Sequence, residues 1–295
     1  MSLRHVKDAL ARRLFLLVSV GCCLLVLPLV VGLCIKARPV LAQQSVAQVL
    51  FSSDWHPLQG RFGMLAFLVG TVYVTVLGMA VAAPLSLLSA IYLAEYAPRW
   101  VRTLTLPLVD LLSGIPSVIY GIWGVLVIVP AVARLGEVFG VYTSGYSLLA
   151  GALVVAIMVS PFMIHISREA LSAVPEGIRE ASLSLGATRW QTVKCAVLRR
   201  ALPGVIAAVV LGLARALGET IAVLMVVGNV PGIPHSLFDP AYPLPALLAN
   251  NYGEMMSIPL YDSALLLAAL VLLVVVVAFN LLAKGILAVM QREAR

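Results

Sequence analysis

Charged residues are scarce in this sequence. Asp, Glu, Lys and Arg make up 11% of its 295 residues, whereas soluble globular domains carry about 25%. Its 4 cysteines offer neither a disulfide framework nor metal-ligand spacing. Apolar side chains, in contrast, make up 62% of residues, and the mean hydropathy is +1.05. The composition excludes a soluble domain, a coiled coil and a disordered chain, and it predicts an all-α membrane protein.

Six apolar runs are long enough to cross a hydrocarbon core, which requires about 20 apolar residues per helix. We predict six transmembrane helices over 14–35, 64–93, 104–130, 148–166, 204–227 and 261–289. The predicted organisation is an N-terminal segment 1–13, a six-span domain 14–290 with a core over 64–290, and a tail 291–295.

The basic residues gather on one side of this scheme. With six spans both termini lie on the same side, and that side holds 15 of the 20 Lys and Arg residues. The positive-inside rule therefore predicts that both termini and the long loop 168–203 are cytoplasmic. Because the charges lie between apolar runs and not on one soluble face, we predict no nucleic-acid binding.

Two longer segments, 37–63 and 228–260, lie on the opposite side. The second is rich in proline, which fixes φ and removes a hydrogen-bond donor. We therefore expect a compact irregular cap without a strand or a long helix. It is either a contact for a partner outside the membrane or a stiff connector.

The third run is interrupted by Ser113-Gly-Ile-Pro-Ser117. Proline and glycine within a span free backbone groups that other groups must satisfy, and broken spans often line a translocation route. Ser113, Ser117 and the preceding Asp110 are therefore candidate path residues. The structural alternative is a simple proline kink.

The fifth run contains a charged pair, Arg215 and Glu219. On a continuous helix, residues four apart share one face. Counted from residue 204, Arg215 would lie about 16 Å into a core about 30 Å thick, where an arginine costs about 2.5–3.5 kcal/mol. We interpret it as an anion site held in position by Glu219. The structural alternative is an ion pair that pins two helices together.

Loop 168–203 predicts two short helices around a turn. Pro175 suits the N1 position of the first helix, and Gly186 suits the position that follows its end. Thr188 and Gln191 form a capping box for the second helix. One small apolar face is predicted on the first helix, formed by Ile178, Ala181, Ser182 and Leu185. Such a loop suits docking into a groove on another protein, or alternatively lying on anionic lipid.

Glu180-Ala-Ser182 followed by Gly186 resembles the EAA loop of ABC importer permeases. In that family the loop forms a coupling helix that seats in the ATPase subunit, which implies this role for Glu180, Ala181 and Gly186. Three further stretches, 113–121, 215–220 and 226–231, are similar to phosphate permeases of the family. The last of these looks like the PstC type rather than its PstA companion. The similarity covers most of the chain from about residue 64 onward.

The resemblance implies a type I ABC importer permease fold in the cell inner membrane, with a cytoplasmic coupling helix. It implies a phosphate importer with four kinds of component: this chain, a second, PstA-like permease, a dimer of PstB-like ATPase subunits and a PstS-like periplasmic phosphate-binding protein. By the family pattern, Arg215 and Glu219 are tied to phosphate passage. ATP would be used by the partner subunit, and this chain would bind no cofactor and no metal.

The sequence departs from the family pattern in two places. Ser182 stands where alanine is usual, and Ala196-Val-Leu-Arg199 stands where Ile-x-Leu-Pro often ends the loop. We therefore expect the far end of the coupling segment to sit differently on the ATPase. Segment 37–63 has no match, so the resemblance does not define its contact with the binding protein.

No catalytic constellation occurs in the sequence. It has no G-x-x-x-x-G-K-[ST] loop for nucleotide phosphates, and its four histidines, which we interpret as solvated or interfacial, have no metal or triad spacing. We predict a transport permease and not an enzyme. The alternatives are a permease for sulfate, molybdate or phosphonate, and a stand-alone transporter or channel gated by the Arg215 pair.

Overall fold

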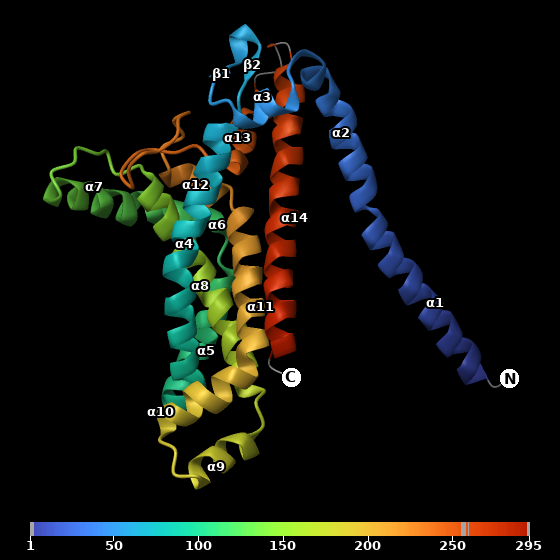
Figure 1. Cartoon of the computed structure of the whole chain (residues 1–295), viewed down its shortest axis with the longest axis vertical. Helices are drawn as coiled ribbons and strands as arrows, with labels where there is room; N and C mark the ends of the chain where they lie inside the picture. The colour runs from blue at the N-terminus through green and yellow to red at the C-terminus, as the bar shows by residue number, and fades with distance from the viewer. Residues whose placement is uncertain (1–2, 255–257, 259, 294–295) are drawn as a thin grey trace.

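The computed structural model describes residues 3–254, 258 and 260–293 and is almost entirely helical (Figure 1). In this part of the chain, six helical stretches are long and apolar enough to cross a membrane: Leu10–Gln43, Leu65–Tyr96, Ser117–Val138, Leu148–Ser172, Arg189–Leu217 and Tyr261–Gly285. The predicted six-span, all-α fold is confirmed. The predicted segments 1–13 and 291–295 lie partly outside the described residues, as does the proline at 259.

Helix α8 (Leu148–Ser172) forms the centre of the bundle, between α4 (Leu65–Ile91) and α11 (Leu198–Leu217). Small residues allow these helices to approach closely. A Cβ atom on Gly78 would lie 3.0 Å from the carbonyl oxygen of Ala152, and one on Gly204 would lie 2.5 Å from the Cβ of Ala170. Apolar side chains from the three helices fill the core between them.

The first span diverges from this bundle (Figure 1). It consists of α1 (Leu3–Leu24) and α2 (Val26–Gln43), and it is longer than the predicted 14–35. Only α2 packs on α14 (Tyr261–Glu293), where the hydroxyl of Ser263 accepts a hydrogen bond from the Val40 N–H (3.2 Å) and donates one to the Lys36 carbonyl (2.8 Å).

The third run is not the single span predicted over 104–130. Its helices are α5 (Arg99–Gly114), α6 (Ser117–Trp123), the π-helical segment η3 (Gly124–Ile128) and α7 (Val129–Val138), which leaves the bundle sideways (Figure 1). Pro116 causes the break, because proline has no N–H and forces the preceding residue out of the helical region. Ile115 is accordingly extended, with ψ 131°.

The fifth span also differs from the predicted 204–227. It begins at α10 (Arg189–Thr192), continues through the π-helical segment η4 (Val193–Val197) and α11, and ends at Leu217. A separate short helix, α12 (Ile221–Val226), follows. The span starts earlier because the loop helix α10 runs directly into it, and it ends earlier because Gly218 closes the helix.

The bundle has two distinct ends (Figure 1). The loop end carries α9 (Glu176–Ser184) and α10, and α1 and α14 extend toward it. The hairpin end carries α3 (Val46–Phe51) and a small hairpin of β1 (Trp55–His56), η1 (Pro57–Gln59) and β2 (Arg61–Phe62). The described residues of segment 228–260 lie on this side as well. As predicted, its described part is irregular apart from the short α13 (Leu244–Asn251) and one isolated β-bridge.

Candidate functional site

Arg215 and Glu219 do not form the predicted pair on one helical face. α11 ends at Leu217, so Gly218 and Glu219 lie in the connection before α12. There Oε1 of Glu219 accepts a hydrogen bond of 3.1 Å from the backbone N–H of Ala222. The prediction was wrong because it assumed one continuous helix, which is required to place residues four apart on the same face.

The guanidinium of Arg215 lies over the ring of Phe162 in α8, 5.5 Å from the ring centroid. The helical stretch that carries Arg215 begins at Arg189 and not at the predicted residue 204, and the depth of Arg215 in the hydrocarbon core stays a prediction. Among the described side chains Arg215 makes no ion pair. A guanidinium stacked on an aromatic face keeps the donors at its edge available for an oxyanion.

The break in the third run lies against the break in the fifth. The hydroxyl of Tyr120 donates to the carbonyl of Leu112 (2.7 Å) and thereby satisfies one group left free where α5 ends. α6 then packs on α12. Gly121 lies at their contact, since a Cβ there would be 2.6 Å from the sulfur of Met225 and 3.2 Å from the Cα of Ala222. The two broken helices therefore form one junction.

Asp110 contacts His165 and not Arg215. Its Oδ1 lies 2.8 Å from Nδ1 of His165, and Nε2 of the same ring lies 3.3 Å from Oε1 of Glu169. The cluster joins α5 to α8 one helical turn from Phe162. His165 therefore belongs to a polar cluster next to the Arg215 stack, which the scattered spacing of the histidines in the sequence did not indicate.

Ser113 and Ser117 flank the break between α5 and α6 at half-exposed positions. The hydroxyl of Ser113 donates to the carbonyl of Asp110 (2.8 Å), a bond within the last turn of α5. Among the described contacts neither serine bonds to Arg215. The structure thus places both at the junction, and their role in a path stays a prediction.

Loop 168–203 folds largely as the sequence predicts. Gly186 follows α9 in the left-handed region with φ +81°, and the N–H groups of Gly186 and Ala187 bond to the carbonyls of Leu183 and Ser182, which is the Schellman pattern. The capping box of Thr188 is present. Pro175 lies one residue earlier than predicted, at the N-cap of α9.

Only part of the apolar face predicted on α9 packs against the rest of the chain. Ile178 packs against the loop-end core, and the hydroxyl of Ser182 lies 2.9 Å from that of Thr192. Ala181 and Leu185, in contrast, are exposed, with Leu185 at 89%. Glu180 is exposed as well. One side of α9 is therefore fixed to the bundle while the other is available to a partner.

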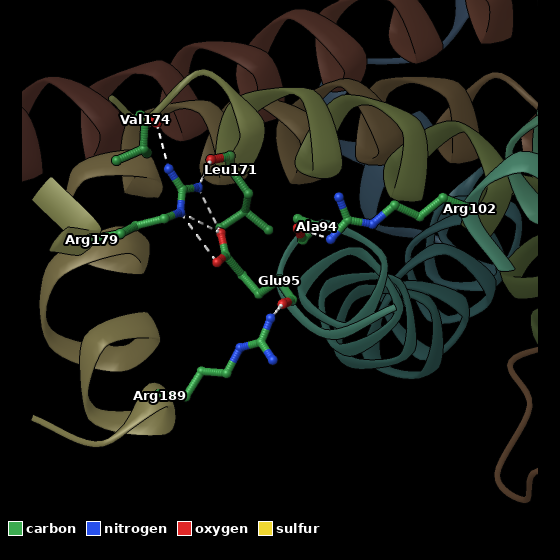
Figure 2. Close-up of polar contacts among 7 residues, drawn as sticks. All are labelled: Ala94, Glu95, Arg102, Leu171, Val174, Arg179 and Arg189. Atoms are coloured by element: carbon green, nitrogen blue, oxygen red, sulfur yellow. Dashed lines mark hydrogen bonds and ion pairs between the residues drawn. The ribbon is translucent and has the colours of Figure 1, made fainter. Parts of the chain in front are cut away.

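A buried ion pair fixes α9 to the end of the second span (Figure 2). Glu95 lies in the π-helical segment η2 (Tyr92–Tyr96), which extends α4, and its side chain is only 9% exposed. Arg179 of α9 donates to both carboxylate oxygens at 2.7–3.2 Å and to the carbonyls of Val174 (2.6 Å) and Leu171 (3.0 Å). The hydrogen bonds to Glu95 raise the pKa of Arg179 above its ordinary value.

Two further arginines bind the same turn of backbone (Figure 2). Arg189 of α10 donates to the carbonyl of Glu95 and lies over the ring of Tyr96, 5.1 Å from its centroid. Arg102 of α5 donates to the carbonyl of Ala94 (2.8 Å). Segment η2 is thus held by three different helices, α5, α9 and α10.

These groups line an open cavity of about 760 Å³ at the loop end. Glu176 and Glu180 of α9 contribute acidic side chains to it, and Arg102, Arg179 and Arg189 contribute basic ones. A cavity lined by charges of both signs offers ion pairs to a protein partner rather than a closed pocket for a small molecule.

Sequence spacing alone does not identify Glu95 as a functional residue. A signal was present, because Glu95 is an acidic residue at the edge of an apolar run, three residues before Pro98, and such residues require a partner. The partner, Arg179, is 84 residues away, and no sequence spacing connects the two.

Known proteins share most of this chain. Residues 82–295 match the family described as binding-protein-dependent transport system inner membrane component. The chain is 40% identical over 240 residues to the probable ABC transporter permease protein YqgH of Bacillus subtilis, covering 81% of this chain and 76% of that protein. It is 35% identical over 309 residues to the phosphate transport system permease protein PstC of Xylella fastidiosa, covering 98% and 94%.

Solved ABC transporters share the fold. The transporter involved in the import of the acidic polysaccharide alginate matches with a TM-score of 0.65 at 16% identity, covering 97% of both chains. The methionine transporter MetNI in an inward-facing conformation matches with a TM-score of 0.59 at 22% identity, covering 77% of this chain and 97% of that one. These likenesses confirm the predicted type I importer permease fold.

The match to the family model covers more than half of the chain, and the similarity to PstC of Xylella fastidiosa extends over 98% of it. Such permeases are multi-pass inner-membrane transport subunits and not enzymes, since ATP hydrolysis lies in separate subunits. The junction of broken helices and the loop-end cluster are therefore parts of a transport subunit, and this chain belongs to the binding-protein-dependent transport system inner membrane component family, the permeases of ABC importers.

Proposed function

We propose that this chain is one of two permease subunits of an ATP-driven importer of inorganic phosphate. The observation that carries the proposal is the junction of two broken helices beside Arg215, whose guanidinium has no ion-pair partner among the described residues. The names of the relatives, which include PstC, support phosphate as the transported anion.

Arg215 suits phosphate because its planar donors match two oxyanion oxygens at once. Stacking on Phe162 orients the guanidinium without using its edge. Glu219 caps α12 through Ala222 and so fixes the connection that follows Arg215. Asp110, Ser113 and Ser117 lie at the neighbouring break, where the serine side chains would contact the anion as it passes. Phosphate would move from the hairpin end toward the loop end.

The loop end would couple this path to ATP hydrolysis. Glu180 and Ala181 are exposed on α9, and Gly186 ends that helix with a rigid turn, so α9 would dock in a groove of a PstB-like ATPase as the coupling helix. When the ATPase subunits close, α9 would move, and the Arg179–Glu95 pair would transmit this movement to α4. ATP would be bound by the partner, and this chain itself would require no cofactor.

The loop end and both termini would lie in the cytoplasm. Supporting this orientation, 15 of the 20 basic residues belong to that side by the positive-inside rule, and α1 and α14 extend toward the loop end (Figure 1). A PstA-like permease would complete the path, and a PstS-like binding protein would deliver phosphate at the hairpin end.

The proposal is tested by uptake of radiolabelled phosphate at low micromolar concentration in cells. Three strains are compared: intact, lacking this chain, and carrying only Arg215→Gln. We expect ATP-dependent uptake to be lost in both altered strains while the complex remains assembled in the membrane with Arg215→Gln. Arg134→Gln is a matched control, because Arg134 is an exposed arginine in α7, remote from Phe162.

Other outcomes would contradict specific parts of the proposal. Unchanged phosphate uptake without this chain, together with lost uptake of sulfate or molybdate, would assign the permease to another oxyanion. Loss of the complex from the membrane with Arg215→Gln would make Arg215 a structural contact between helices. Transport that continues without the ATPase would indicate a stand-alone transporter.

A further inference from the structure

His165 of α8 lies between two carboxylates. Its Nδ1 is 2.8 Å from Oδ1 of Asp110 in α5, and its Nε2 is 3.3 Å from Oε1 of Glu169 on the next turn of α8. A ring nitrogen without a proton would turn its lone pair toward a carboxylate oxygen, which is repulsive. With ionised carboxylates, both contacts are therefore attractive only when both nitrogens carry a proton and the ring is an imidazolium.

The three side chains belong to membrane-crossing helices but are not packed away from their surroundings. α8 coincides with a stretch, Leu148–Ser172, that is long and apolar enough to cross a membrane. The side chains of His165, Asp110 and Glu169 are nevertheless 40%, 56% and 60% exposed. Charged groups in such stretches as a rule face a water-filled cavity or another protein and not lipid. The exposed side of this cluster is therefore in contact with water or with another subunit.

The cluster lies one helical turn from the stack of Arg215 on Phe162. The ring of Phe162, which carries the guanidinium at 5.5 Å, precedes His165 by three residues, and residues three apart share one face of a helix. Asp110 lies near the end of α5, and Arg215 lies in the last turn of α11. At this separation within a span, a free carboxylate and a guanidinium attract each other more strongly than in bulk water.

Asp110 nevertheless contacts His165, and Arg215 makes no ion pair among the described residues. A His165 ring that lost its second proton would no longer attract both carboxylates. A released Asp110 would then pair with Arg215 and occupy the donors that an oxyanion requires. The contact between Asp110 and His165 therefore keeps a competitor away from the guanidinium.

His165 is the only histidine in the helices that surround it. The elements packed against α8 are α4, α5, α6, α7, α11, α12, η2 and η3. α12 and η3 have no titratable residue, and α4 and α6 add only the phenols of Tyr73 and Tyr120. Besides the cluster, the carboxylates are Glu95 in η2, which binds Arg179, and Glu137 in α7.

The basic residues of α8 and of these packed helices are Arg99, Arg102, Arg134, Arg168, Arg199, Arg200 and Arg215. Arginine keeps its charge at every pH that a protein tolerates. Histidine, in contrast, changes its charge between about pH 5 and 8. Near neutral pH, His165 is therefore the group that changes the charge of this cluster.

We propose that His165 is a proton-dependent positioning residue of the transport path: its imidazolium holds Asp110 away from Arg215 and so keeps the guanidinium open to the transported anion. The inference rests on the proposed function, in which Arg215 binds phosphate. Import would slow as the pH rises above neutrality, because fewer His165 rings then carry the second proton. Glu169 supports this state through the other ring nitrogen.

The experiment measures ATP-driven uptake of radiolabelled phosphate by the whole importer in lipid vesicles, with its second permease, ATPase subunits and binding protein. His165→Phe keeps a ring but removes both nitrogens. We expect uptake to fall about tenfold or more, the effect of one charge-assisted hydrogen bond, in a complex that still assembles. Adding Asp110→Asn should restore most of this uptake, because asparagine has no charge with which to compete for Arg215.

The pH profile is a readout that a purely structural contact would not change. Uptake is measured from about pH 6 to 8.5 on the ATP side. Because phosphate itself changes protonation in this range, the variants are compared with the unaltered importer at each pH. Uptake by the unaltered importer should fall more steeply with rising pH than uptake by the double variant. His235→Phe is the matched control, since His235 is an exposed histidine in segment 228–260, and it should leave the profile unchanged.

Three outcomes would overturn the positioning role and leave the proposed function intact. The first is an importer that takes up phosphate equally well with and without His165→Phe. The second is a loss of uptake that Asp110→Asn does not restore, which would make His165 a structural contact between α5 and α8. The third is the same pH profile for the unaltered importer and the double variant. If the unaltered importer takes up no phosphate at any pH, the proposed function itself fails.

A second variant keeps the test decisive if His165→Phe does not assemble. The side-chain amide of His165→Gln can donate to one carboxylate but carries no charge. We expect an intermediate loss of uptake and, as in the double variant, a shallower dependence on pH. Uptake by His165→Gln with the pH profile of the unaltered importer would show that another group causes the pH dependence.

Discussion

At both ends of the molecule a carboxylate pairs with basic side chains, but the pair is buried at the loop end and exposed at the hairpin end. At the loop end Glu95 binds Arg179 in a pair whose side chains are 9% and 19% exposed. At the hairpin end Asp54 binds His56 and Arg61, and all three side chains are at least 37% exposed. The loop-end partners are 84 residues apart in the sequence, whereas the hairpin partners lie within seven.

The difference in burial indicates different roles for the two ends: the loop-end pair fixes two helices to each other, whereas the hairpin contacts shape a local turn. Breaking a buried ion pair leaves an uncompensated charge, which costs about 3–5 kcal/mol. The loop-end pair therefore holds α9 firmly to the end of α4. Exposed pairs contribute little to stability because water screens them. The hairpin contacts can only set the shape of a local turn.

Removing the buried anchor should have the largest effect. We expect Glu95→Gln to lower stability by about 3–5 kcal/mol, because Arg179 keeps its charge without a counter-ion. A thermal melt of the purified complex should show this loss, and phosphate-stimulated ATPase activity should fall with it. Glu176→Gln is the matched control, since Glu176 lines the same cavity but is exposed.

A second variant keeps this test informative if Glu95→Gln does not fold. Glu95→Gln combined with Arg179→Met removes both charges and should recover much of the stability while coupling stays lost. Full coupling in this double variant would show that α9 transmits its movement to the bundle by another route.

A smaller effect is expected from Arg179→Lys, which keeps the charge but not the planar group. An ammonium cannot donate to the carboxylate and to both carbonyls of Leu171 and Val174 with the geometry of a guanidinium. Hydrogen bonds to charged groups contribute about 1.5–3 kcal/mol, so we expect an intermediate melting temperature and partial coupling. A variant indistinguishable from the unaltered protein would mean that charge alone holds α9.

The two ends can be compared directly at matched glycines. Gly186 and Gly60 both have positive φ, and neither has an atom within 4 Å of the position of a Cβ. Alanine at either site should therefore cost about 1–2 kcal/mol through backbone strain alone. We expect Gly186→Ala to weaken ATPase coupling and Gly60→Ala to weaken stimulation by the binding protein. Measuring both activities for both variants would show whether the two ends act separately.

The smallest expected effect is the loss of the Asp54 contacts in the hairpin at low pH. Arg61 and His56 hold the pKa of Asp54 below its ordinary value of 3.8, so the contribution of Asp54 to the hairpin is fully present above about pH 4 and is lost as the pH falls through the lowered pKa. The raised pKa of Arg179 has the opposite sign, and its contribution is lost only in strong base.

The contributions of Asp54 and Arg179 should therefore both be complete between about pH 5 and 9. Fluorescence of Trp55 in a variant lacking the other tryptophans should change as the pH falls below about 4. A change at acid pH that persists in Asp54→Asn would show that a different group controls the hairpin.

Local signals in the sequence predicted much of the structure correctly. The capping box at Thr188 and the turn at Gly186 formed as expected, because each depends on hydrogen bonds between residues close in the chain. The break at Pro116 was also expected, since proline acts on its immediate neighbours. The prediction on Glu219 was wrong because periodicity alone did not reveal that Gly218 ends α11.

Long-range contacts could not be predicted in this way. Arg179 meets Glu95, Arg215 meets Phe162 and Asp110 meets His165 across different helices. Each pair depends on how the helices pack and rotate about their axes, and no sequence spacing records that rotation.

The sequence by itself determined that this chain is a six-span helical membrane protein whose loop 168–203 forms capped helices around a turn, because transfer of apolar residues from water and local capping depend only on residue type and near neighbours. The tertiary structure alone decided which charges pair and where the broken helices meet. A buried charge is stable only beside a specific partner, and only the packing of α4, α5, α8, α9 and α11 brings those partners together.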